Sequence, residues 1–485
     1  MTVRDTQPRE RVIVPRVSHP TELLAATLAL VRDDLKLSEL FPAEVESEAA
    51  FAVENYELPD ADRLDVPFVT IDPEGATDLD QAVHLERAAD GYTVHYAIAD
   101  VPAFVKPNGA VDAEARQRGQ TLYAPDGRIP LHPPVISEGA ASLLPDVERG
   151  AYVWTFALDA SANVTSTALL RARIRSRRQY SYTEVQELID SGHADESLKL
   201  LQEIGDKRVE RERERGGASL NRPDEEIEFL DGRYELVRRS PLPVEACNAQ
   251  ISLLTGMAAA SIMLEGRVGI LRTMPEPYED TLEHFRVQVA ALGCPWPRDV
   301  AYGEYLRLLP RDEPRGLAAI HAAASLFRGA GYTAFVGELP EKTLQAAVAA
   351  PYAHTTAPLR RLVDRFVLVT CESLVNGRPV PDWVREALPL LPKLMSKSDG
   401  VASRLERASV DAIEAALLSG QVGEAFDAVV ISSKPATDKR PSGGVIQLTD
   451  PVVTANVEGD VVAGARVRVT LETADIATGT TLFRV

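Results

Sequence analysis

The stretch Thr70-Ile-Asp-Pro-Glu-Gly-Ala-Thr-Asp-Leu-Asp-Gln81 sets three carboxylates, Asp72, Asp78 and Asp80, in a turn between two strand-like runs. The flanking runs, rich in apolar and β-branched residues, are Phe68–Ile71 and Ala82–Leu85. Asp, Gly and Pro are ordinary turn residues, so a solvated acidic turn is one interpretation. A metal site is the other, because neighbouring carboxylates repel one another and lose hydration unless a cation neutralises them.

The residue types in this loop indicate which metal ion it would bind. Carboxylate oxygens are hard ligands that suit Mg²⁺ or Mn²⁺, and Mg²⁺ normally keeps coordination positions open for water and substrate phosphate. An EF-hand calcium loop would need alternating ligands, a central Gly and a distal Glu, and this segment lacks that register. We therefore expect Asp72, Asp78 and Asp80 to bind Mg²⁺, with Mn²⁺ as a substitute.

Composition predicts a globular chain. Its 485 residues are 45% hydrophobic and 26% charged, which is enough for one large domain and one or two small ones. The chain has no run of about 18 consecutive apolar residues, and its first residues lack an apolar secretory segment. We expect a cytoplasmic protein with no membrane partner. The three cysteines have no CxxC spacing, which argues against disulfides and structural zinc.

The net charge of −20 has the wrong sign for general affinity toward nucleic acid, so any such binding must be local. One basic stripe stands out in Leu170–Arg178, where every second residue is an arginine on the same face of a predicted strand. Its members are Arg171, Arg173, Arg175 and Arg177. A phosphate track and a solvated edge strand are equally good interpretations of this stripe.

The chain divides into three predicted parts. Residues 1–65 form a short segment, disordered to about residue 18 and then helical over Pro20–Arg32. Residues 66–419 mix strands with long helices, including one that begins at Tyr182, which is an α+β pattern. Residues 420–485 hold short strands between turns, the rhythm of a small all-β barrel. Its only aromatic residues are Phe426 and Phe483, a poor platform for base stacking.

The acidic loop closely resembles the signature of the RNase II family, the hydrolytic 3′→5′ exoribonucleases built on the RNB catalytic domain. More blocks that resemble the family follow in the family's order, from about residue 66 to 410. They are Tyr96–Val101, Thr121–Pro130, Ile136–Glu138 with Ser142–Leu143, and Pro351–Arg361 with Asp364. The resemblance implies a large RNB-type domain of mixed sheet and flanking helices, followed by an S1-like OB-fold barrel.

The resemblance also implies a reaction, namely two-metal-ion hydrolysis of single-stranded RNA to nucleoside 5′-monophosphates. Asp80 would be the carboxylate nearest the attacking water. Arg360 would clamp the scissile phosphate, because a guanidinium fork matches two phosphate oxygens at once. From the residues alone, a salt bridge between Arg360 and Asp364 is the alternative.

Further residues match positions that hold the 3′ end of RNA in the resembled family. Tyr123 and Tyr182 match two tyrosines that pack against the terminal nucleotides, where stacking tolerates any sequence. Glu245 and Glu406 resemble acidic residues that contact ribose hydroxyls, the groups that distinguish RNA from DNA. Taken alone, each tyrosine would more often belong to the core, and Glu406 would lie on a solvated helix face.

Two features depart from the family pattern. The family most often has a fourth aspartate directly after the third, and here Gln81 occupies that position. An amide can donate an oxygen to a metal but brings no charge, so we expect Gln81 in the metal site with one ion bound less tightly. The segment before the loop is also too short for the two cold-shock OB folds that family members commonly carry there.

Three functions remain in view from the sequence. The leading one is a metal-dependent 3′→5′ exoribonuclease that acts on single-stranded RNA as a monomer, with no obligate protein partner evident. The second is a catalytically impaired RNB-fold protein that only binds RNA, suggested by Gln81 and the acidic composition. The third, a metal phosphohydrolase for a small nucleotide, fits the ordered blocks less well.

Overall fold

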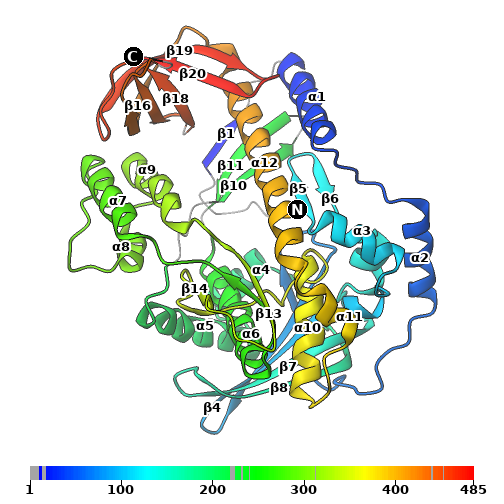
Figure 1. Ribbon diagram of the computed structural model, residues 1–485. Helices are drawn as coiled ribbons and strands as arrows, with labels where there is room; N and C mark the ends of the chain where they lie inside the picture. The colour runs from blue at the N-terminus through cyan, green and yellow to red at the C-terminus, as the bar shows by residue number, and fades with distance from the viewer. Residues whose placement is uncertain are drawn as a thin grey trace.

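The computed structural model describes residues 10–13, 18–218, 224–230, 233–239, 241–311, 313–438, 441–451 and 453–485. Over these residues the chain forms an α+β body that carries a closed β-barrel at its C-terminal end (Figure 1). The predicted fold class, an α+β domain of mixed sheet and flanking helices followed by a small all-β barrel, is observed.

A four-stranded antiparallel sheet organises the body. Its strands, in spatial order, are β3 (Gln81–Ala88), β4 (Gly91–Ala99), β7 (Glu148–Asp159) and β8 (Val164–Arg175). Side chains alternate along β4, so Tyr96 and Ile98 enter the larger core while Ala97 and Ala99 face the opposite one. The central strands β4 and β7 are therefore buried on both faces, which explains their long apolar runs, whereas β3 and β8 at the edges carry more polar residues.

Helices cover the two faces of this sheet. The larger core takes residues from α4 (Tyr182–Asp190), α5 (Glu196–Glu214), α6 (Pro243–Gly266) and α10 (Leu362–Val375). The opposite core takes residues from α2 (Ala43–Glu54) and α3 (Ala110–Arg118). Among the described helices, only α6 is long and apolar enough to cross a membrane by composition, a test that buried core helices also pass.

A short parallel pair of strands places the acidic loop. β2 (Thr70–Asp72) pairs with β9 (Gln179–Ser181) so that Asp72 lies opposite Ser181. α4 begins at the next residue, Tyr182, because the Ser181 hydroxyl caps the helix by accepting the Glu184 N–H at 3.1 Å. The register of this pair therefore brings Asp72 and Tyr182 to the same edge.

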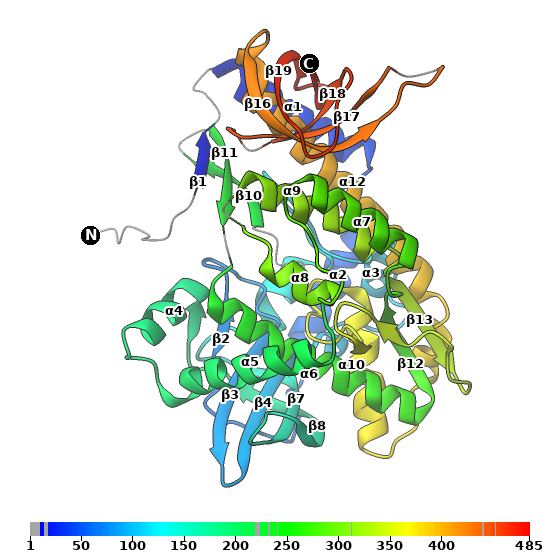
Figure 2. The same ribbon diagram turned by 90° about the vertical axis from the view of Figure 1, so that its left-hand side faces the viewer.

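A long helix, α12 (Leu391–Leu418), joins the body to the barrel (Figures 1 and 2). α1 (Ser18–Asp34) packs along its C-terminal half, where Leu24 and Leu28 meet Ile413 and Ala416. The predicted helix over Pro20–Arg32 is thus observed. The hairpin of β5 (Leu122–Ala124) and β6 (Gly127–Ile129) packs against α12 nearer the body.

The remaining elements connect the body to the barrel or extend the body. The helices are α7 (Glu279–Ala291), α8 (Tyr302–Leu308), α9 (Pro314–Ala323) and α11 (Asp382–Ala387). The strands are β1 (Glu10–Ile13), β10 (Asp224–Leu230), β11 (Arg233–Arg239), β12 (Val268–Thr273), β13 (Gly331–Val336), β14 (Leu344–Gln345) and β15 (Ala350–Pro351). α7, α8 and α9 share one core with Val429 and Ile431 of the barrel, so the barrel is seated on them.

The barrel closes through five strands in the order β16-β17-β18-β20-β19. They are β16 (Ala425–Lys434), β17 (Gly443–Leu448), β18 (Thr454–Glu458), β19 (Arg466–Asp475) and β20 (Thr480–Arg484). Phe426 and Phe483 meet edge to face in its core, with ring centroids 5.7 Å apart. Neither ring offers a surface for base stacking, as expected.

Two predictions about the sequence are resolved by the fold. Residues 1–18 were expected to be disordered, but Glu10–Ile13 form β1 and pair with β11; residues 1–9 and 14–17 lie outside the described residues. The arginine stripe lies on β8, an edge strand of the sheet, and its side chains are engaged within the protein. The ion pairs are Arg171 with Asp100 at 2.5 Å, Arg173 with Asp62 at 3.2 Å and Arg175 with Glu148 at 2.6 Å. The edge-strand interpretation is therefore correct, and the phosphate track has no support.

Candidate active site

Asp80 is the point where the acidic loop meets the arginine segment. It lies directly before β3, and its buried carboxylate accepts the backbone N–H of Leu359 through Oδ1 at 2.8 Å. The Nε atom of Arg360 lies 3.7 Å from Oδ2. Burial raises the pKa of Asp80 well above its usual value, while Arg360 and the Leu359 N–H oppose that rise. Asp80 and Arg360, to which the resemblance assigned roles in the same reaction, thus lie side by side.

Asp72 ends β2 and carries an unsatisfied carboxylate oxygen. Its Oδ2 atom is buried and has no hydrogen-bond partner. Burial, followed by the charge of Asp78, raises the pKa of Asp72 to about 7, and Arg360 opposes the rise. Buried polar atoms are rarely left without a partner, so this oxygen fits a position that a cation would occupy.

Asp78 is held by an arginine to which the sequence analysis assigned no role. Arg128, on β6, places Nη1 2.7 Å from Asp78 Oδ1 and Nη2 2.7 Å from Glu138 Oε1. It also donates to the Thr77 hydroxyl at 2.8 Å. The ordered sequence blocks contained Arg128 and Glu138, and that shared membership was the only signal that linked them to the loop.

Gln81 lies in the site, but both ends of its amide are engaged within the protein. Nε2 donates to the carbonyl oxygen of Thr356 at 2.6 Å, and Oε1 accepts the Tyr96 hydroxyl at 2.8 Å. A carbonyl only accepts hydrogen bonds, so the contact with Thr356 fixes which end of the amide faces which partner. The geometry therefore does not favour the predicted role of Gln81 as a metal ligand. Gln81 instead links the start of β3 to Thr356 and Tyr96.

The fit of these residues to a divalent cation is partial. In the part of the chain that the structure describes, no three His, Cys, Asp or Glu side chains are gathered closely enough to hold a metal ion. Asp72 and Asp80 fit a hard cation by their chemistry, since Asp80 is a buried carboxylate, Asp72 has a buried oxygen without a partner, and the charge of Asp78 raises the pKa of both. Arg128 competes with a metal for Asp78, because it already occupies the Oδ1 atom of that carboxylate.

Arg360 does not form the salt bridge that was its alternative role. Asp364 is instead paired with Arg361, whose Nε and Nη2 atoms lie 3.0 and 2.8 Å from its two carboxylate oxygens. The side chain of Arg360 is 43% exposed and lines a pocket of about 360 Å³ together with Tyr123 and Glu406. The Arg360 guanidinium has its Nε atom near Asp80 and is partly exposed to solvent, so it can bind a phosphate.

Tyr123 is brought to Arg360 by backbone contacts between distant segments. The Thr121 N–H donates to the Arg360 carbonyl oxygen at 2.9 Å, and Gln120 bridges to Arg361. Tyr123 is 57% exposed, so its ring faces the pocket and not the core. Glu406 enters the same pocket from α12. The interpretation of Tyr123 as a core residue is wrong.

Tyr182 and Glu245 lie on the Asp72 side of the site. Burial, followed by the charge of Asp72 and with a smaller effect of Glu245, raises the pKa of Tyr182 to about 12, and Arg360 opposes the rise, so these three charges act on the Tyr182 hydroxyl. The Tyr182 hydroxyl accepts Asn248 Nδ2 at 3.2 Å. The Glu245 carboxylate accepts the Leu242 N–H at 3.0 Å and so caps α6.

Comparison with known proteins identifies both parts of the chain. Residues 61–376 match the RNB domain, and residues 424–485 match the RNase II-type exonuclease C-terminal S1 domain. Ribonuclease R of Escherichia coli is 30% identical over 361 residues, which cover 67% of this chain and 42% of that protein. The chain therefore spans less than half the length of this relative.

Solved structures show the same fold. RNase R of Mycoplasma genitalium, in complex with ribose-methylated single-stranded RNA, superposes with a TM-score of 0.82 at 18% identity, over 95% of this chain and 78% of that one. Yeast Ssd1, described as a pseudonuclease, superposes with a TM-score of 0.61 at 17% identity, over 89% of this chain and 53% of its own. From the match over residues 61–376 and the likeness to ribonuclease R, the chain belongs to the RNB-domain family of RNase II-type exoribonucleases.

Proposed function

We propose that the chain is a metal-dependent exoribonuclease that removes nucleotides from the 3′ end of single-stranded RNA and releases nucleoside 5′-monophosphates. One observation carries the proposal: Arg360 lies 3.7 Å from the buried Asp80, is not paired with Asp364, and opens into a pocket shared with Tyr123. A buried carboxylate next to an open guanidinium is an arrangement suited to a phosphodiester at a metal site.

Each residue of this site has a separate role in the proposed reaction. Asp72 and Asp80, with Asp78 once it is released from Arg128, would hold Mg²⁺ or Mn²⁺, which when bound supplies an activated water and neutralises phosphate charge. Arg360 holds two oxygens of the scissile phosphate through its guanidinium fork. The Leu359 N–H keeps the Asp80 carboxylate in place beside it.

The substrate end is held by rings and carboxylates around the pocket. Tyr123, with its exposed ring, stacks on a terminal base, and Tyr182 packs against a neighbouring one. Glu245 and Glu406 accept ribose hydroxyls, which gives a preference for RNA over DNA. Stacking and ribose contacts read no base sequence, so we expect degradation of single strands of any sequence.

A second function is favoured by two contacts in the site. Gln81 brings no charge and is engaged with Thr356 and Tyr96, and Asp78 is paired with Arg128. If Arg128 keeps Asp78, the site has two carboxylates for metal and would bind RNA without hydrolysing it. The chain would then be an RNA-binding protein on a nuclease fold.

A degradation assay tests the two functions against each other. RNA labelled at its 5′ end, and DNA of the same sequence, would be incubated with Mg²⁺ or Mn²⁺ and wild-type protein, Asp80→Asn, or the control Asp90→Asn in an exposed turn. We expect RNA alone to be shortened, by wild type and the control but not by Asp80→Asn. RNA that is bound but never shortened would support the second function. If RNA with a 3′-phosphate were cleaved as fast as unblocked RNA, degradation from the 3′ end would be excluded.

A further inference from the structure

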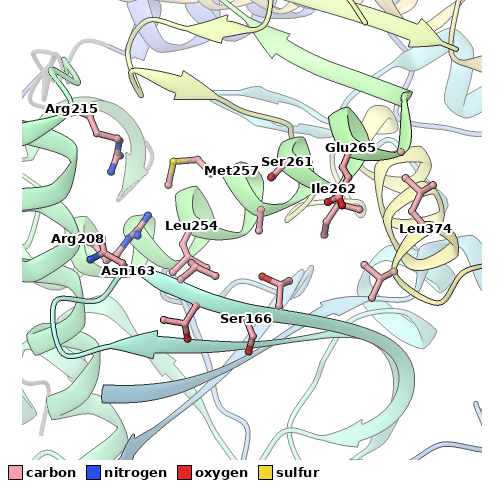
Figure 3. Close-up of a pocket in the computed structure, with 16 residues that line it drawn as sticks. Asn163, Ser166, Arg208, Arg215, Leu254, Met257, Ser261, Ile262, Glu265 and Leu374 are labelled. Carbon is pink, nitrogen blue, oxygen red and sulfur yellow. The ribbon is translucent and has the colours of Figure 1, made fainter. Parts of the chain in front are cut away.

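A second crevice lies between α5, α6 and the strand β8, and it shares no residue with the pocket of Arg360 and Tyr123 (Figure 3). Its volume is about 820 Å³, within the range of small-molecule sites. The wall from α6 is largely apolar, with Leu254, Met257 and Ile262, and the floor from β8 offers the hydroxyls of Ser166 and Thr167. None of these residues takes part in the proposed reaction.

Arg208 of α5 and Arg215, the residue that follows this helix, lie at one end of the crevice with hydrogen-bond donors that have no acceptor. Arg208 is only 4% exposed; its Nη1 donates to the Ala162 carbonyl oxygen at 3.1 Å, while its Nε and Nη2 are buried without a partner. The Nε and Nη2 atoms of Arg215 are likewise buried without a partner. Nε and Nη2 form the side-on edge of a guanidinium, which binds two oxygens of one oxyanion through parallel hydrogen bonds. Each of the two arginines therefore has a pair of parallel donors, Nε and Nη2, without an acceptor.

The side chains of Arg208 and Arg215 lie at the same end of the crevice. Arg208 and Arg215 are seven residues apart, about two helical turns, and Figure 3 shows both side chains reaching toward the same end of the crevice. Burial, followed by the charge of Arg215, lowers the pKa of Arg208 to about 10, while Glu212 opposes the shift. The two cations are therefore close enough to repel each other.

The protein provides little neutralisation for this pair. Glu212 is the acidic side chain that acts on both arginines, but its carboxylate is shared with Gln250 at 2.7 Å and with Arg307 at 3.4 Å. Glu265 also lines the crevice, from the C-terminal end of α6. Among the described residues, no carboxylate forms an ion pair with Arg208 or Arg215. Sheltered guanidinium groups without counter-ions are costly, and a dianion would satisfy both.

We propose that this crevice is a phosphate-binding site, in which the Nε and Nη2 edges of Arg208 and Arg215 hold one phosphate group. The phosphate is carried either by a small phosphorylated molecule, which the apolar wall of α6 and the hydroxyls of β8 would accommodate, or by the backbone of an RNA strand. The inference does not depend on the proposed nuclease activity, because it rests on residues outside that site.

Calorimetric titration with inorganic phosphate tests the proposal. It would be done in EDTA on protein that already carries Arg360→Gln, so that neither metal nor the phosphate clamp of the active site contributes. We expect one phosphate to bind this protein, and the affinity to fall about tenfold or more when Arg208→Gln or Arg215→Gln is added, since each removes charge-assisted hydrogen bonds. The control Arg298→Gln removes an exposed arginine from the loop after α7 and should leave the affinity for phosphate unchanged.

Two further measurements keep the outcome clear. Arg215→Met removes a half-buried cation that has no ion pair among the described residues, so the thermal unfolding temperature should not fall, which separates loss of binding from loss of fold. Anisotropy of a labelled RNA in EDTA distinguishes the sources: a tenfold weaker affinity with Arg215→Gln identifies the RNA backbone, and an unchanged RNA affinity identifies a small phosphorylated molecule. Two results together overturn the proposal. The first is that phosphate either fails to bind or binds all variants with the same affinity, and the second is that the substitutions leave the affinity for RNA unchanged.

Discussion

Gln81 Nε2 donates a hydrogen bond to the carbonyl oxygen of Thr356 at 2.6 Å, which ties β3 to the segment that carries Arg360. The other end of the amide accepts the hydroxyl of Tyr96, which also contacts the Ser252 hydroxyl at 2.7 Å. One side chain thus links the acidic loop, the central sheet, α6 and the arginine segment. The position that resembles a metal-ligand position acts here as a structural joint.

We predict that Gln81→Ala loses stability even without metal. The variant leaves the buried Thr356 carbonyl without its partner, which should cost about 1–3 kcal/mol of unfolding free energy. Urea unfolding in EDTA would measure this loss, with Gln117→Ala on the exposed face of α3 as the control. If Gln81 served only as a metal ligand, the variant and the wild type would be equally stable in EDTA.

Much of the fold could be predicted from the sequence because the signals are local. The helix from Tyr182 to Asp190 begins where expected since Ser181 caps it through the Glu184 N–H. The central strands β4 and β7 are buried on both faces and rich in apolar residues, so they too could be predicted. β20 has a weaker local signal, because Thr480–Arg484 is short and completes the barrel by pairing in parallel with β18, a contact that no local pattern encodes.

The site residues could be identified, but not their partners. The contact of Asp80 with Leu359 joins positions 279 apart in sequence, and that of Asp78 with Arg128 joins positions 50 apart. Spacing along a helix suggested that Arg360 would pair with Asp364, but the neighbouring Arg361 does so. Which of two adjacent arginines turns inward depends on the backbone path, and the sequence does not state it.

Arg360 and Arg361 should therefore respond differently to the same change. Arg361→Gln leaves the fully buried Asp364 without its cation, so we expect a loss of about 3–5 kcal/mol in unfolding free energy. Arg360→Gln alters a half-exposed side chain and should stay within about 0.5 kcal/mol of wild type. Urea unfolding of both variants checks this; equal losses would contradict the assignment of the ion pair.

The activities of the two variants complete the comparison. Arg360→Gln should slow RNA degradation about 100-fold or more, because a lost charge-assisted contact to the reacting phosphate costs about 3 kcal/mol or more. The rate would be measured at saturating RNA and Mg²⁺ on protein confirmed as folded. A variant that is both stable and fully active would rule out Arg360 as the phosphate clamp.

Acid should destabilise the protein through His132. Burial and the nearby Arg365 lower the pKa of His132 to about 3, from about 6.5 in an unfolded chain. Between these values the unfolded chain binds more protons, so stability falls as the pH drops from about 6.5 toward 3, by at most about 1.4 kcal/mol per pH unit.

The contribution of His132 can be isolated by substitution. His132→Leu should flatten the dependence of unfolding free energy on pH between about 6.5 and 4.5, whereas His193→Gln, at an exposed turn, should leave it unchanged. Some slope will remain, because burial also lowers the pKa of His354 well below its usual value. Identical slopes in wild type and His132→Leu would contradict the prediction.

Tyr123 should contribute to RNA binding through its ring and not its hydroxyl. Stacking on a base is worth about 1–3 kcal/mol, so Tyr123→Ala should weaken binding by about 5- to 150-fold while Tyr123→Phe binds like wild type. Anisotropy of a labelled single strand in EDTA measures this without hydrolysis. Tyr278→Ala removes a ring that is 75% exposed and remote from the pocket, and should have no effect. Because Tyr123 is itself 57% exposed, its truncation should not destabilise the fold, so equal binding by Tyr123→Ala and Tyr123→Phe would mean that no base stacks there.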